Sequence, residues 1–60
     1  MENYRIYFTD DDGDEKRLTV LTKDDVELAI SYLQNSHKKV SDIRVETYVG
    51  FIFKEMRWIE

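Results

Sequence analysis

The 60-residue chain contains no cysteine and no proline, and it has only two glycines and one histidine. Without cysteine, neither disulfides nor thiolate metal sites can form, so we expect a reducing compartment and a cytoplasmic protein. No apolar run is long enough to span a membrane, and the N-terminus lacks the pattern of a signal peptide. The sequence therefore predicts neither membrane association nor export.

The same scarcities argue against catalysis. Two glycines are too few for a phosphate-binding loop, and no serine lies in a nucleophile-elbow pattern. The single histidine, His37, follows a predicted helix, where a surface role is the default. Asp24 and Asp25 are adjacent on that helix and point in different directions, so they form no acid–base pair. We expect no enzyme activity and no cofactor.

The stretch FTDDDGDEKR, residues 8–17, raises the question of a calcium site. If a loop of the EF-hand type began at Asp10, its sixth position would be Glu15 instead of glycine, and its twelfth would be Leu21 instead of glutamate. The spacing fails, so no metal site is predicted here.

A turn explains the stretch better. Apolar and polar residues alternate on both sides of it, as in two half-buried strands. A three-residue loop at 11–13, with Gly13 in the left-handed conformation, pairs Ile6 with Leu18 and Tyr4 with Val20. A two-residue loop would mix the two faces, so the longer loop is predicted.

A helix is predicted from about Lys23 to Ser36. Thr22 is its expected N-cap, and a stripe at helical spacing is expected to be buried: Val26, Ala29, Ile30 and Leu33. Leu28 and Tyr32 fall on another side of this helix. They form an exposed apolar pair, read either as isolated surface residues or as a weaker contact site.

A second hairpin follows the helix. Alternation from Ile43 to Val49 predicts one strand, and the apolar run after Gly50 predicts another. A tight turn at Val49 and Gly50 would place Arg44 opposite Glu55, which charge pairing favours. A register shifted by one residue is the alternative.

Residues 1–60 are therefore predicted to form a single ββαββ domain of the α+β class. We expect a four-stranded antiparallel sheet in the order 2-1-4-3, because the charged strands then lie at the edges and the apolar last strand lies inside. One helix covers only one face of such a sheet. The function then depends on what the other face presents.

The uncovered face is predicted to combine all four arginines of the chain with aromatic rings, a combination that protein interfaces select. Its candidate interface residues are Arg5, Tyr7, Arg17, Arg44, Tyr48, Phe51, Phe53 and Arg57. Three interpretations stay open: a solvated ladder without a partner, a contact with a protein partner (itself or another), and single-stranded nucleic acid on the rings and arginines. The protein contact is favoured, because the aromatic residues would otherwise form an apolar patch on a domain that is short of core. Thirteen acidic against nine basic residues give a net charge of −4, which argues against nucleic acid.

A second candidate surface is acidic and comprises Asp10, Asp11, Asp12, Asp14, Glu15, Asp24, Asp25 and Glu27. Such a surface can imitate the phosphates of DNA and occupy a nucleic-acid-binding protein. In size and charge the chain is similar to small acidic inhibitors encoded by phages. The overall expectation is a small acidic protein-interaction module, either a homodimer or a binding or inhibitory partner of another protein.

Overall fold

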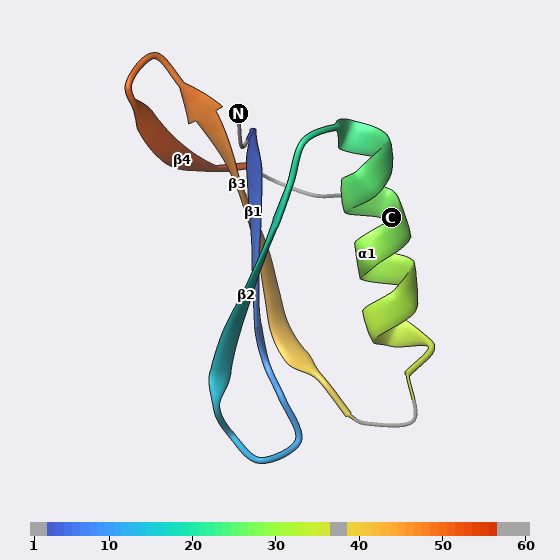
Figure 1. Ribbon diagram of the computed structural model, residues 1–60. Helices are drawn as coiled ribbons and strands as arrows, with labels where there is room; N and C mark the ends of the chain where they lie inside the picture. The colour runs from blue at the N-terminus through green and yellow to red at the C-terminus, as the bar shows by residue number, and fades with distance from the viewer. Residues whose placement is uncertain (1–2, 37–38, 57–60) are drawn as a thin grey trace.

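The computed structural model describes residues 3–36 and 39–56 of the chain (Figure 1). The elements are β1 (Tyr4–Thr9), β2 (Glu15–Val20), α1 (Lys23–Gln34), β3 (Ser41–Val49) and β4 (Ile52–Met56). Four antiparallel strands form one sheet, and α1 lies on one of its faces. The predicted α+β class is confirmed.

The first hairpin has the predicted register. Ile6 pairs with Leu18 and Tyr4 with Val20, and Gly13 has a φ of 85°. The Asp10 N–H donates to the Asp14 carbonyl at 2.9 Å, and the Gly13 N–H donates to the Asp10 carbonyl at 3.1 Å. This is a three-residue loop with glycine in the left-handed position, a conformation that residues with a Cβ rarely adopt.

Helix α1 begins as its sequence predicts. The Thr22 hydroxyl accepts a hydrogen bond from the Asp25 N–H at 3.1 Å, which satisfies one of the free donors of the first turn. The helix ends at Gln34, two residues before the predicted end, and the Asn35 N–H donates to the Ser31 carbonyl at 3.0 Å.

The core is small and joins the helix to the two central strands. Its buried residues are Ile6, Val26, Ile30, Leu33 and Val45. Val20 and Ala29 pack against this cluster while remaining partly exposed. A core of this size suits a chain of 60 residues, which buries only about 60% of its unfolded surface.

The predicted strand order is wrong. The observed order is β2-β1-β3-β4, so β4 is an edge strand and β3 lies inside. The 12 residues of α1 carry the chain back by about 18 Å, to the end of the sheet where β1 finishes. Thr9 pairs with Ser41, so β3 starts beside the end of β1 and runs antiparallel to it. Strand β4 then runs parallel to β1, so the predicted contact between them would have been parallel, and β4 pairs antiparallel with β3 instead.

The predicted register of the second hairpin is also wrong, by two residues. Val49 pairs with Ile52, which makes Gly50 and Phe51 the two turn residues. Gly50 takes the first turn position with a φ of 65°. The predicted turn would have placed the β-branched Val49 there, where a two-residue hairpin turn demands a positive φ. The shift is even, so the side chains that remain in the two strands keep their predicted faces.

Candidate interaction surface

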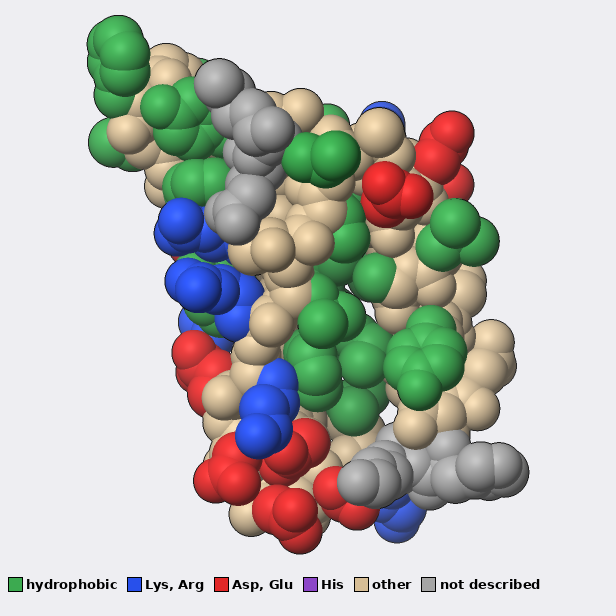
Figure 2. Space-filling model, viewed as in Figure 1, with side chains coloured by type: hydrophobic (Ala, Val, Ile, Leu, Met, Phe, Trp, Pro, Cys, Tyr) green, Lys and Arg blue, Asp and Glu red, His purple; other side chains and the backbone are tan. Residues whose placement is uncertain are grey.

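The sheet face opposite α1 carries the predicted mixture of arginine and aromatic side chains, with basic groups gathered on the side away from the helix (Figure 2). Arg44 does not stand opposite Glu55 as predicted. Its Nη2 lies 3.3 Å from Glu15 Oε2, and its guanidinium carbon lies 5.4 Å from the centre of the Tyr7 ring. Glu55 instead stands opposite Glu46. The predicted pairing of Arg44 with Glu55 is therefore wrong, and the acidic partner of Arg44 lies on β2.

Arg5 and two aromatic rings form a stacked cluster that ties the second hairpin to β1. The guanidinium carbon of Arg5 lies 3.7 Å from the centre of the Phe53 ring. The Tyr48 and Phe53 rings meet edge to face, with centroids 5.2 Å apart. Cation–π and edge-to-face contacts are both attractive, so the rings are held in place before any partner arrives.

The turn of the second hairpin exposes a group of apolar side chains that we name the hairpin tip. Its members are Tyr48, Val49, Phe51, Ile52 and Phe53. Phe51 is 94% exposed and Ile52 57% exposed, and Figure 1 shows this hairpin extending away from the helix. Phe51 was expected on the sheet face, but it occupies the turn itself.

Two members of the hairpin tip, Val49 and Ile52, were missed from the sequence. The available signal was charge, because residues 47–53 carry none in a chain that is 37% charged. The alternation of apolar and polar residues predicted that these two side chains lie on the sheet face covered by α1. Their exposure follows from the projection of the hairpin beyond the helix, which periodicity does not reveal.

The predicted acidic surface consists of two separate groups. Asp10, Asp11, Asp12, Asp14 and Glu15 surround the first turn, whereas Asp24, Asp25 and Glu27 lie at the start of α1. Strand β2 begins at Glu15 and runs from the first group toward the start of α1, so its length separates the two groups. Figure 2 shows acidic side chains at opposite ends of the molecule. A ligand that spans only the distance between two neighbouring DNA phosphates cannot contact both acidic groups.

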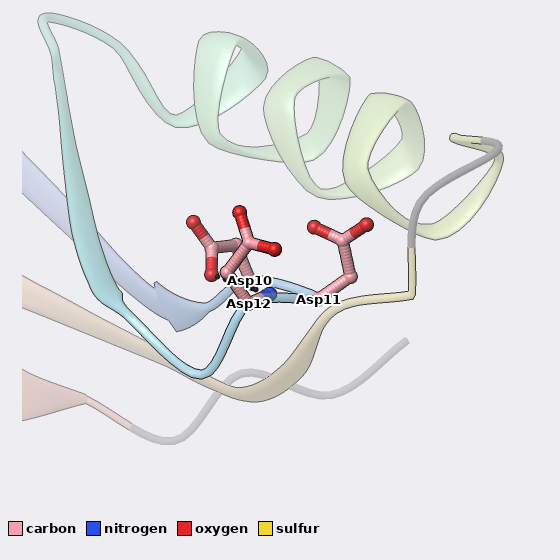
Figure 3. Close-up of side chains that lie close together, drawn as sticks. All are labelled: Asp10, Asp11 and Asp12. Atoms are coloured by element: carbon pink, nitrogen blue, oxygen red, sulfur yellow. Dashed lines mark hydrogen bonds between the residues drawn. The ribbon is translucent and has the colours of Figure 1, made fainter.

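Three carboxylates of the first turn lie close together. One oxygen each from Asp10, Asp11 and Asp12 falls within 4.8 Å of the others (Figure 3). Asp10 is already used by the turn, since its Oδ1 accepts from the Asp12 N–H at 3.0 Å and the Asp14 N–H at 2.9 Å. Its Oδ2 lies 3.9 Å from Lys16 Nζ. The cluster has a structural explanation in the turn.

The remaining predicted residues are distributed as follows. Arg17 pairs with Tyr7 across the first hairpin, on the uncovered face. Leu28 and Tyr32 are 68% and 73% exposed on α1, as the helical spacing predicted. Arg57 and His37 lie outside the described residues.

Comparison with known proteins identifies no relative of this small α+β domain. A scan against protein-family models, a search of curated proteins and a search of solved structures each gave no match. Within residues 3–36 and 39–56, no helix combines the length and the apolar character needed to cross a membrane.

Proposed function

We propose that this chain is a small protein-interaction module that binds another protein through the hairpin tip and the adjoining sheet face. The observation that carries the proposal is the exposure of Phe51 next to Ile52 and Val49. Phe51 alone exposes most of the roughly 150–250 Å² that an aromatic side chain can bury. Contiguous apolar surface of this kind on a small domain is typical of contact sites.

The neighbouring contacts support a protein partner more than nucleic acid. Arg5 stacks on Phe53, and Arg44 pairs with Glu15, so these two arginines are engaged within the chain. Glu46 and Glu55 stand opposite each other on the same face, where they repel phosphates. An uncharged tip with rings held in place matches the centre of a protein interface, which is poor in charge and rich in aromatic residues.

The test is quantitative affinity capture from cell extract with the wild type and two matched variants, followed by titration of any recovered protein in purified form. Phe51→Ser removes a ring that is 94% exposed and leaves the core untouched. Leu21→Ser removes an exposed apolar side chain of the loop before α1 and serves as the control. We expect Phe51→Ser to weaken the purified complex by about 30-fold or more, as for an interface hot spot, and Leu21→Ser to leave it unchanged.

Two further arms separate the alternatives. Asp11→Asn with Asp12→Asn removes two charges of the acidic turn; loss of the partner in this variant alone would transfer the function to the acidic surface. Titration with a fluorescent single-stranded oligonucleotide at several salt concentrations tests the nucleic-acid alternative. Affinity that falls steeply with salt and survives in Phe51→Ser would contradict the proposal.

A further inference from the structure

Strand β2 is an edge strand whose free hydrogen-bonding groups can be identified. The bond from Asp10 N–H to Asp14 O closes the first hairpin, so the even-numbered residues of β2 face β1 with their backbone groups. The bond from Tyr48 N–H to Asn3 O agrees, since it directs the odd-numbered residues of β1 toward β3. The N–H and C=O groups of Arg17 and Thr19 therefore point away from the sheet.

An apolar groove runs beside this free edge, between β2 and the C-terminal half of α1. Its volume is about 590 Å³, and its apolar lining includes Phe8, Leu18, Tyr32, Leu33 and Val40. Figure 2 looks onto this side of the molecule and shows apolar side chains around a hollow between sheet and helix. Tyr32 belongs to the exposed stripe of α1, and Leu28 lies one helical turn before it. A free strand edge and an exposed apolar stripe thus border one groove.

We propose that a second copy of this chain docks here, with its β2 antiparallel to the first β2 and the pair centred on Leu18. Two registers of such a pair place side chains of the same sheet face opposite each other and overlap five residues of each strand, one centred on Arg17 and one on Leu18. One places Arg17 opposite Arg17 of the second copy, which like-charge repulsion disfavours. The other places Arg17 opposite Thr19, Lys16 opposite Val20, and Leu18 opposite itself, so that no charge stands opposite a charge. Its hydrogen bonds come from Arg17 and Thr19, the residues with free groups.

This arrangement also covers the exposed stripe of α1. The two-fold axis is perpendicular to the joined sheet, so both helices lie on one face, side by side. Helix α1 packs on β1, and three strand spacings separate β1 from its copy, or about 14 Å. Close-packed helices lie about 8–10 Å apart, so long side chains are needed to bridge the difference. Leu28 and Tyr32 supply them.

The size of this side predicts a weak dimer. The molecule measures 35 × 21 × 20 Å, and the side carrying β2 and the stripe of α1 excludes the hairpin tip, so it covers less than the area of a full 35 × 20 Å side. Stable interfaces cover about 800 Å² per partner. The hairpin tip takes no part in this contact, so the inference goes beyond the function proposed above.

The first experiment is molecular mass by sedimentation equilibrium from about 1 µM to about 1 mM, a range that resolves weak dimers. The expected mass rises from 7.3 kDa toward twice that value. Thr19→Pro removes an outward N–H and leaves the β1 ladder intact, so it should abolish the rise while circular dichroism stays native. Glu55→Pro is the matched control, because residue 55 points its N–H away from β3 at the other edge of the sheet.

A pair of charge variants tests the register itself, and both retain an exposed side chain at position 19. Thr19→Glu places a carboxylate opposite Arg17 of the second copy, whereas Thr19→Lys places a cation there. With two such pairs per dimer, the dissociation constant should fall about 2- to 30-fold in the first and rise as much in the second. The net charge of the chain has the opposite effect on the dissociation constant, because glutamate makes both copies more acidic and increases the repulsion between them. Residue 19 also stands opposite Arg5 of the same chain. The unfolding free energy of each variant is therefore measured as a control.

Three outcomes would overturn the inference. The first is a mass that stays at 7.3 kDa throughout the range. The second is a dimer that persists in Thr19→Pro and is lost in Phe51→Ser, which would place self-association at the hairpin tip. The third is a shift in the same direction for the glutamate and lysine variants. None of these results bears on whether Phe51 binds a different protein.

Discussion

The stack of Arg5 on Phe53 connects β1 to the edge strand β4, and its free energy is measurable by a double-mutant cycle. Strand β4 pairs only with β3, so this contact is one of few that hold it to the rest of the sheet. The variants are Arg5→Met, Phe53→Leu and the combination of both. Methionine keeps most of the arginine stem, and leucine keeps an apolar side chain of similar reach.

The expected magnitude follows from geometry. The guanidinium carbon lies 3.7 Å from the ring centre, and both side chains are half-buried. Cation–π pairs contribute about 0.5–1 kcal/mol when exposed and about 2 kcal/mol when desolvated, so the coupling should be about 1 kcal/mol. Arg5 Nε is buried without a hydrogen-bond partner among the described residues. Arg5→Met removes that unsatisfied donor, so it alone should destabilise less than the coupling suggests.

The assay is urea unfolding followed by circular dichroism, with thermal unfolding as a second measurement. A difference of about 1 kcal/mol corresponds to about 4–8 °C in Tm for a domain of this length. The unfolding free energy of the double variant should exceed the additive value by about 1 kcal/mol. Additivity within about 0.3 kcal/mol would refute the reasoning, because the two groups would then act independently.

Three further predictions concern the first turn and the helix cap. Gly13→Ala should lower the free energy of unfolding by about 1–2 kcal/mol in urea titrations, because its φ of 85° lies in the left-handed region. No atom lies within 4 Å of an added Cβ, so a steric clash does not contribute to this loss. Gly13→Asn should cost less, and an alanine variant as stable as the wild type would contradict the backbone argument. Thr22→Ala should lower the free energy of unfolding by about 1 kcal/mol, because the hydrogen bond from the Asp25 N–H is lost. Thr22→Ser should retain this hydrogen bond, so equal losses in both variants would show that the hydroxyl is not the cause. Calcium should bind the turn only weakly, because Asp10 already accepts backbone hydrogen bonds; micromolar affinity in calorimetry at physiological salt would reverse that interpretation.

Local interactions made the first hairpin and the helix start readable from sequence. Gly13 can adopt a φ that other residues avoid, and matching apolar faces leaves one sensible register for its two strands. Thr22 caps α1 through a bond to a residue only three positions away. Part of the candidate site followed in the same way, because alternation along β1 and β3 assigns Arg5, Tyr7 and Arg44 to one face.

The sequence by itself thus determined the element types, the first register and the face of each strand residue, since these depend on turn chemistry and a period of two. Tertiary structure decided the strand order, because the length of α1 returns the chain beside the end of β1. Turn chemistry decided the second register: a shift of two residues leaves the face of every strand residue unchanged, so periodicity cannot detect it, but the positive φ needed at the first turn position selects Gly50 over Val49. The hairpin tip follows from both decisions. Strand β4 lies at the edge and the turn falls at Gly50 and Phe51, so uncharged side chains extend beyond the helix. The absence of charge marks residues 47–53 as unusual, but it does not distinguish an exposed tip from a buried strand.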